Sequence, residues 1–295
     1  MTAESSIDLP ALPMFVAEVS SNHARDLERC SEFIRTTADI GAHAVKFQLF
    51  RVDALFAPEI LAASAPHRAR EAWELPVAFL SPIADMCREA RIEFIITPFD
   101  LAAVEQSAPY VDRFKISSYE LLWPDLIKAC AATGKPLIIS TGMADEAEIA
   151  NAVEVYKSAG GADLTLLHCV SSYPMPAADA NLSAISTLST AFGLPVGWSD
   201  HSRDPAIITR AVHRFGATTI EFHLDLDGEG AEFPSGHCWL PEEIRPVIAA
   251  CLVDAEADGD GRKVAMPSEL PDRDWRADPE DGLRPLKSVR KTYHG

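Results

Sequence analysis

Eight short apolar segments alternate with longer helix-like segments along this chain, and this alternation restricts the fold more than any other feature. Apolar runs of roughly four to seven residues are typical of buried strands, whereas the segments between them repeat apolar residues with a helical period. The expected strands span residues 14–19, 44–49, 93–98, 113–118, 136–141, 164–170, 195–200 and 218–224. Eight strands that alternate with helices predict an α/β protein with a closed (β/α)8 TIM barrel. An open doubly wound sheet is the alternative, but no GxGxxG motif follows the first strand.

Glycines stand at the ends of several helix-like segments, just before the next strand. A helix commonly ends on a residue in the left-handed conformation, which glycine adopts without steric cost. This conformation is expected at Gly41, Gly134, Gly160 and Gly216.

The length and composition suit one large domain. The chain has 295 residues, of which 47% are hydrophobic, which is enough for a single extensive core. The barrel is expected to occupy residues 1–257 and to end with a helix over residues 241–257. The polar stretch over residues 258–295 is rich in proline and aspartate and is expected to be an extended tail.

The charge and the apolar pattern exclude several classes of partner. The formal net charge is −18, from 44 acidic and 26 basic residues, so the global field repels nucleic acid and anionic membranes. No apolar run reaches the roughly 18 residues that a membrane helix needs, and the first residues lack a basic, apolar leader. Six cysteines are scattered without a CxxC pair, which favours reduced thiols. A soluble, cytoplasmic protein without nucleic-acid or membrane partners is expected.

Polar residues gather where a barrel places its chemistry. In TIM barrels the active site lies at the carboxyl ends of the strands. Charged or imidazole residues near these ends include Glu18, Lys46, Lys115, Glu120, His168, His201, Glu221 and His223. A single buried lysine or histidine is usually structural, but burying many such groups costs a few kcal/mol each. The whole set therefore indicates a functional site.

Two kinds of binding chemistry are available in this set. Two lysines, together with hydroxyl donors on neighbouring strands, can bind a phosphate and a carboxylate, and we expect an anion to be needed for their burial. These residues are Lys46, Lys115, Thr97, Ser118, Ser140 and Ser199. His201 and His223, on adjacent strands, can approach within about 4 Å, and imidazole with oxygen ligands suits Mn, Zn, Fe or Co. Water, substrate or a carboxylate such as Glu18 would have to complete that site.

The same segments resemble the sialic acid synthase family, whose members condense phosphoenolpyruvate with an N-acyl sugar such as N-acetylmannosamine. The similarity runs from about Phe15 to Glu243 in the family's order. Its motifs are AEVSSNHARDLE, GAHAVKFQLF, ITPFD, FKISSYEL, GKPLIISTGMA, LLHCVSSYP, LPVGWSDHS and GATTIEFH. The resemblance implies a metal-dependent transferase that makes a 2-keto-3-deoxy sugar acid and phosphate from phosphoenolpyruvate and a sugar aldehyde. It also implies that the protein is a homodimer.

The resemblance also implies roles for individual residues. The phosphoenolpyruvate ligands would be Lys46, Thr97, Lys115, Ser118, Ser140, Ser171 and Ser199, and the residues facing the acceptor sugar would be Gln48, Phe99, Glu120 and Tyr173. His201 and His223 match the family's two metal ligands, with Mn2+ expected and Mg2+, Co2+ or Zn2+ as alternatives. The catalytic group would comprise Lys46 and Lys115, which hold the enolpyruvate, and either Glu18 or Glu120, which orients water or acts as general base.

The last third of the chain departs from the family pattern. Family members usually continue into a small antifreeze-like domain that supplies an arginine, and that domain is expected to be absent here. Phe222 replaces a family lysine. In the following loop, four polar residues either replace polar groups of the family's site or simply lie in a solvated loop: Asp225, Asp227, Glu232 and His237. The solvated loop is the favoured interpretation for Asp225 and Glu232. The acceptor is therefore expected to differ from N-acetylmannosamine.

Some features allow more than one interpretation. Trp198 and Trp239 either stack on the acceptor or pack in the core or a dimer interface. His67, Arg68 and Arg70 either bind an acidic acceptor or form a solvated helix face, which is favoured. Two other functions stay open: a metal-dependent aldolase or isomerase that uses no phosphoenolpyruvate, and a non-catalytic barrel that binds a sugar or a partner protein.

Overall fold

The computed structural model describes residues 12–258 and 261–292. Of the described residues, 12–255 belong to one compact unit, and those from Glu256 onward belong to a second. Within the described residues, no helix combines the length and the apolar character that crossing a membrane requires.

The first unit is a closed barrel of eight parallel strands in sequential order, with β8 pairing back to β1. The strands are β1 (Met14–Glu18), β2 (Ala44–Leu49), β3 (Glu93–Pro98), β4 (Arg113–Ile116), β5 (Leu137–Ser140), β6 (Leu164–Cys169), β7 (Val196–Asp200) and β8 (Thr219–His223). Every strand predicted from the sequence is present, with ends displaced by at most two residues. The predicted TIM barrel is confirmed.

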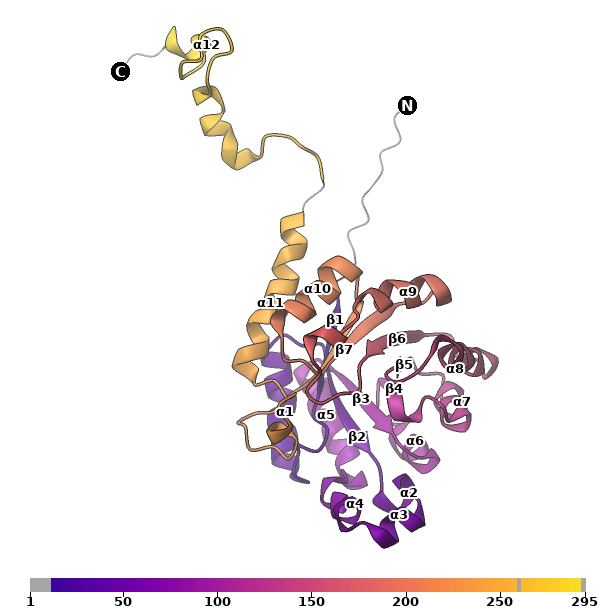
Figure 1. Ribbon diagram of the computed structural model, residues 1–295. Coiled ribbons are helices and arrows are strands. Elements are labelled where there is room, and N and C mark those ends of the chain that lie inside the picture. The colour runs from indigo at the N-terminus through magenta and orange to yellow at the C-terminus, as the bar shows by residue number, and fades with distance from the viewer. Residues whose placement is uncertain (1–11, 259–260, 293–295) are drawn as a thin grey trace. The chain divides into compact units, whose positions relative to one another are not determined.

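Helices surround the strands (Figure 1). The main ones are α1 (Leu27–Asp39), α5 (Leu80–Ala90), α6 (Leu101–Ser107), α7 (Pro124–Ala132), α8 (Glu146–Ser158), α9 (Ser183–Phe192), α10 (Pro205–Phe215) and α11 (Pro241–Asp258). Shorter elements are α2 (Val52–Leu55), α3 (Pro58–Ala63), α4 (Ala65–Ala69) and the 3-10 turns η1 (Arg70–Trp73), η2 (Val77–Phe79), η3 (Ser118–Glu120), η4 (Ala177–Asp179) and η5 (Phe233–Ser235).

Local sequence signals define many of the helix ends. Aspartate side chains accept from backbone N–H groups at the first turns of α1, α6, α8 and α10, and such caps satisfy donors that the helix itself cannot. Asp145 and Glu148 form a full capping box on α8. The four glycines expected in the left-handed conformation all have positive φ.

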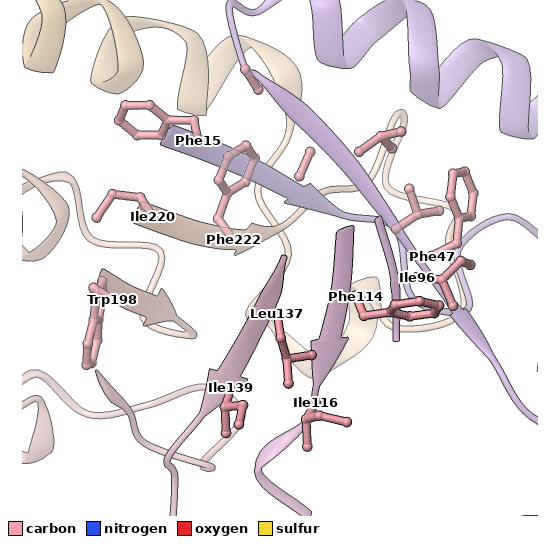
Figure 2. Packing of buried hydrophobic residues seen from close by; sticks show 14 of the residues in the cluster. Phe15, Phe47, Ile96, Phe114, Ile116, Leu137, Ile139, Trp198, Ile220 and Phe222 are labelled. Carbon is pink, nitrogen blue, oxygen red and sulfur yellow. The ribbon is translucent and has the colours of Figure 1, made fainter. Parts of the chain in front are cut away.

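Two apolar layers hold the barrel together. The larger layer lies between the strands and the helices, and Figure 2 shows Phe15, Phe222 and Trp198 among its members. A small inner layer consists of Val16, Ala44, Ile95, Ile138 and Leu167.

The inner layer fixes which strand residues face the mouth. Because side chains alternate along a strand, residues two positions beyond that layer also point inward. They are Glu18, Lys46, Thr97, Ser140 and Cys169. On β7 the inward position is Gly197, where a Cβ would come within 2.2 Å of the Thr219 carbonyl oxygen and 2.7 Å of Leu167. The barrel is therefore closed beneath a polar layer.

The second unit, described by itself, contains the 3-10 segment η6 (Pro267–Trp275) and the short helix α12 (Lys287–Arg290). Asp278 accepts hydrogen bonds from the N–H groups of Glu280 and Lys287, and Arg290 pairs with Asp281. The division predicted at residue 257 remains a prediction.

Candidate functional site

A buried cluster of two lysines and two glutamates lies in the polar layer. Lys46 pairs with Glu18 and lies 3.6 Å from Glu221, while Lys115 lies 3.1 Å from the same Glu221 oxygen. Lys46 also donates to the Thr97 hydroxyl at 3.2 Å, and the Ser199 hydroxyl donates to Glu221 at 3.3 Å. Strand register brings these groups together, since Glu18 is opposite Lys46 and Ser199 is opposite Glu221. Four strands and their register thus fix one charged network.

The carboxylates neutralise the lysines within the protein. Burial alone lowers the pKa of Lys46, but Glu18 and Glu221 outweigh this effect and raise it. Burial raises the pKa of Glu221, yet Lys115 and Lys46 dominate and lower it to about 2. The expectation that burial of these lysines requires a bound anion is therefore wrong, because Glu18 and Glu221 supply the counter-charges.

Hydroxyl groups from the next strands lie at the other side of this layer. The Gly142 N–H donates to the Ser118 hydroxyl at 3.0 Å. A Cβ at Gly142 would come within 2.4 Å of the Ser171 hydroxyl and 2.8 Å of that of Ser118, so the backbone approaches both serines closely. The hydroxyls of Ser140 and Ser171 are buried and have no hydrogen-bond partner among the described residues. Such donors are available to a ligand.

The four predicted acceptor residues do not form one direct network. Gln48 donates to Glu18 at 2.6 Å, which links it to the lysine cluster. Phe99 packs edge-on against Phe50 with ring centroids 5.8 Å apart. Glu120 accepts from the Ser117 hydroxyl, and burial raises its pKa. A raised pKa makes this carboxylate a stronger base than an exposed glutamate.

Tyr173 belongs to an aromatic cluster with three histidines. Its ring centroid lies 4.2 Å from that of His201, 4.9 Å from that of His237 and 6.1 Å from that of His223. The His201 and His223 rings are 5.3 Å apart, and the His223 and His237 rings are 4.5 Å apart. The two predicted metal ligands therefore lie in ring contact, and a third histidine joins them.

Glu232 connects two of these imidazoles. Its Oε2 lies 3.1 Å from His223 Nδ1 and 3.6 Å from His237 Nε2, and Ser20 donates to its Oε1 at 2.5 Å. Burial raises the pKa of Glu232, but the hydrogen bonds with His223 and His237 outweigh it and hold the pKa well below its usual range. The carboxylate is thus charged and lies between the two rings.

The donor atoms of this cluster suit a divalent metal ion. One donor atom each from His223, Glu232, His237 and Cys238 lie within 4.8 Å of one another. Burial lowers the pKa of His237 and of His201, so each imidazole keeps a lone pair at neutral pH. His201 Nδ1 lies 2.9 Å from the Val170 carbonyl oxygen, a contact that orients the ring and leaves Nε2 available.

The favoured interpretation of Asp225 and Glu232, in the loop after β8, is wrong. Glu232 and Asp225 were expected in a solvated loop, yet the Asp225 side chain is fully buried and that of Glu232 is only 20% exposed. Asp225 accepts from the N–H groups of Gly228 and Gly230 and pairs with Arg29 at 3.1 Å. Hydrogen bonds and the ion pair thus remove Asp225 from solvent, although other residues of the loop, such as Asp227, are exposed.

Two tryptophans and a histidine occupy the core instead of the mouth. Trp198 and Trp239 are buried, and their indole N–H groups donate to the two oxygens of Asp200, each at 3.1 Å. His168 packs on Trp198 with ring centroids 5.2 Å apart and contacts the Ala180 carbonyl oxygen. His168 was expected among the functional groups at the strand end. The alternation of side chains along β6 instead directs it toward the helices.

The basic stretch after β2 makes local contacts. His67 lies against Phe56 with ring centroids 4.8 Å apart, Arg70 lies over the same ring, and Arg68 donates to the Leu61 carbonyl oxygen. These contacts agree with the favoured interpretation that the three residues form a solvated helix face.

Four functional candidates were not assigned roles from the sequence or were assigned wrongly. Glu221 carries a usable signal, because it lies two residues before His223 and so shares the inward face of β8. Glu232, His237 and Cys238 lie on a loop without periodicity, where only tertiary contacts bring them to the site.

Comparisons with known proteins complete this description. The family model described as the NeuB family matches residues 33–263. An uncharacterised protein of Methanocaldococcus jannaschii is 36% identical over 261 residues, covering 87% of this chain and 75% of its own length. The N,N'-diacetyllegionaminic acid synthase of Legionella pneumophila is 35% identical, covering 88% and 76% of the two chains. The crystal structure of N-acetylneuraminic acid synthetase from Leptospira borgpetersenii, in complex with citrate, superposes with a TM-score of 0.79 at 30% identity, covering 89% and 90% of the two chains.

Proposed function

The chain belongs to the NeuB family, and on this premise we propose that it condenses phosphoenolpyruvate with a sugar aldehyde. The acceptor is an aldose or an N-acyl-hexosamine, and the products are a 2-keto-3-deoxy sugar acid, similar to a sialic acid, and phosphate. The single observation that carries the proposal is the buried network of Lys46 and Lys115 with its surrounding hydroxyl groups.

The lysine network supplies what an enol phosphate needs. Phosphoenolpyruvate carries a phosphate and a carboxylate, and two ammonium groups can each donate charge-assisted hydrogen bonds to them. Ser140 and Ser171 add buried hydroxyls that lack partners among the described residues. Glu18 and Glu221 balance the charges of Lys46 and Lys115.

Two carboxyl groups are placed for proton transfer. The condensation forms a bond between C3 of the enolpyruvate and the aldehyde carbon, water then adds at C2, and phosphate departs. Glu18 lies beside Lys46 in the polar layer, and for Glu120 burial dominates and raises the pKa above its ordinary value. We propose that one of them orients the water or removes its proton.

The acceptor side is formed by polar and aromatic groups. Gln48 contacts Glu18 and can donate to a sugar hydroxyl, while Phe99 and Tyr173 offer ring surfaces. A divalent ion, Mn2+ by family similarity, bound at the histidines around His201 and His223 would act as a Lewis acid on the aldehyde oxygen.

The ion pairing weakens the Schiff-base alternative. An aldolase lysine attacks a carbonyl as the neutral amine, whereas the neighbouring carboxylates raise the pKa of Lys46 and keep it protonated. Trapping with borohydride should therefore not label Lys46 in the presence of carbonyl substrates.

Phosphate release tests the proposal. Purified protein with Mn2+ and phosphoenolpyruvate should release phosphate with at least one member of a panel of hexosamines, N-acyl-hexosamines, aldoses and aldose phosphates. Lys115→Ala should abolish the release, and the matched change at an exposed lysine of α7, Lys128→Ala, should preserve it. Folded protein that stays silent across the panel would overturn the proposal.

Cellular location and assembly follow from the same similarity. We propose a cytoplasmic homodimer; the six cysteines are all buried, and their scattered spacing without a CxxC pair suits a reducing compartment. Sedimentation of the purified protein tests the dimer.

A further inference from the structure

Ser20, in the loop between β1 and α1, has a backbone conformation that a serine rarely adopts. Its φ is +50°, in the left-handed region, and the residue is only 2% exposed. A residue with a Cβ is strained in this region, and such strain persists only where the surrounding structure enforces it. Strain of this kind is concentrated at functional sites, so the contacts of the Ser20 side chain indicate its role.

The Ser20 hydroxyl joins two parts of the site that lie on different elements. It accepts from Gln48 Nε2 at 3.0 Å and donates to Glu232 Oε1 at 2.5 Å. Gln48 is a residue of β2, whereas Glu232 lies on the loop between β8 and α11. One hydroxyl therefore connects the strand-borne side of the site with the loop-borne side.

The direction of these two hydrogen bonds is fixed by their chemistry. A charged carboxylate only accepts, and a hydroxyl has one proton to donate. Because the neighbours of Glu232 keep it charged, the Ser20 proton points to it, and a lone pair of Ser20 faces the Gln48 amide. The same amide donates to Glu18 Oε1 at 2.6 Å. Gln48 is therefore held at two points, which give its amide group one orientation.

The turn itself does not need a serine. Glycine occupies the left-handed region without strain. Backbone bonds already close the turn, because the Asn22 N–H donates to the Val19 carbonyl oxygen at 3.0 Å and the Val19 N–H to that of Lys46 at 2.9 Å. The Asn22 side chain separately accepts from the Glu232 N–H at 2.9 Å. The strained residue thus supplies a hydroxyl that the fold could omit.

We propose that Ser20 is a positioning residue that orients the Gln48 amide toward the acceptor sugar. It acts through Gln48, which it ties to the carboxylate of Glu232, and does not touch the reacting atoms. Because an amide that can rotate makes poorer contacts with a sugar, loss of the hydroxyl weakens acceptor binding and spares phosphoenolpyruvate. The effect on the acceptor rests on the proposed function, whereas the tie between Ser20 and Gln48 does not.

Ser20→Gly removes the hydroxyl and keeps the left-handed backbone conformation. In the phosphate-release assay, the KM for the accepted sugar should rise roughly five- to tenfold, as for one lost hydrogen bond, and the KM for phosphoenolpyruvate should not change. Ala24→Gly is the matched control, because Ala24 lies in the same loop with φ +52° and is exposed. It relieves similar strain and should leave both KM values unchanged. Equal rises of both KM values in Ser20→Gly would overturn the proposal.

A double-mutant cycle tests whether Ser20 acts through Gln48. Gln48→Met removes the amide, and adding Ser20→Gly to it should raise the KM for the sugar no further, because effects through one shared group are not additive. A second rise of the same size would show that Ser20 acts by another route and would exclude the positioning role. Circular dichroism establishes that each variant is folded.

Hydrogen exchange of the Gln48 side-chain amide tests the tie without any substrate. Its NMR signal in nitrogen-15-labelled protein is identified by its absence from Gln48→Met. Exchange should be faster in Ser20→Gly than in the wild type or in Ala24→Gly, because the amide loses a partner. Unchanged exchange would overturn the proposal. Faster exchange in a protein that accepts no sugar from the panel would overturn the proposed function alone.

Discussion

The lysine network and the histidine cluster lie at the same end of the barrel, but the protein positions them in different ways. Lys46, Lys115 and Glu221 are strand residues, and strand register alone sets their distances. Glu232 and His237 lie on a loop that is fixed by hydrogen bonds to residues distant in sequence. Strand-borne groups should therefore tolerate changes in the loop, whereas the metal cluster should not.

The largest effect is expected from breaking the lysine network. Lys115→Ala leaves Glu221 with Lys46 as its remaining ammonium partner, at 3.6 Å, and should lower the free energy of unfolding by about 3–5 kcal/mol. Phosphate release should fall by roughly 10²–10³-fold or more, because the substrate loses a charged donor. Urea unfolding and the phosphate assay measure the two effects.

A double variant separates stability from binding in this network. Replacing both Lys115 and Glu221 with methionine leaves the Lys46–Glu18 pair intact, so most of the lost stability should return. Phosphate release should remain absent. Recovery of activity together with stability would show that Lys115 is structural only.

A change confined to the loop should affect the metal and spare the lysine network. A Cβ at Gly230 would come within 2.3 Å of Asp225 Oδ1 and 2.5 Å of Asn22 Oδ1, so Gly230→Ala must displace the loop. Mn2+ affinity should fall by roughly 10–100-fold, and phosphoenolpyruvate binding, followed by calorimetry, should be unchanged.

A second glycine of the same loop provides the control. Gly236 has φ +80° and open space where a Cβ would lie, and asparagine tolerates this conformation. Gly236→Asn should therefore bind Mn2+ like the wild type. Equal losses in the two variants would contradict the view that the hydrogen bonds of Asp225 and Asn22 to this loop hold the metal ligands.

Acid should weaken the strand-borne network in a defined range. The pKa of Glu221 is about 2 in the folded protein, below its ordinary value of 4.5. The unfolded chain therefore binds the proton first, so stability from this group is present above pH 4.5 and is lost as the pH falls toward 2. Unfolding free energies between pH 7 and pH 2.5 should fall more steeply in the wild type than in the double methionine variant. Parallel curves would contradict this assignment.

The smallest effect is expected at the edge of the loop. Asp227 pairs with Arg29 at 2.8 Å, but its side chain is 48% exposed, so Asp227→Asn should cost less than about 1 kcal/mol. Mn2+ affinity should change by no more than a few fold. Glu28→Gln, in an exposed pair with Arg35, is the matched control and should change neither quantity.

The barrel and the strand-borne half of the site could be predicted from the sequence. Apolar runs defined the strands, and Lys46, Thr97 and Ser140 were identified as polar residues near their carboxyl ends. The alternation of side chains along a strand would have placed Glu221 with His223 and would have excluded His168, because its neighbours Leu167 and Cys169 face inward.

The loop-borne half could not be predicted in this way. Glu232 is largely buried because Asn22, 210 positions earlier, accepts from its backbone, and Ser20 donates to its carboxylate. Nothing in the local sequence after β8 encodes these partners, so a polar, glycine-containing segment resembled a solvated loop. Tertiary hydrogen bonds determine its conformation.

The most direct test of the central claim is mass spectrometry of the reaction product. Carbon-13-labelled phosphoenolpyruvate, Mn2+ and the accepted sugar should give one product with the mass of the sugar plus pyruvic acid, together with one phosphate per product. Phosphate released without this condensed product would contradict the claim that the network holds an enolpyruvate for carbon–carbon bond formation.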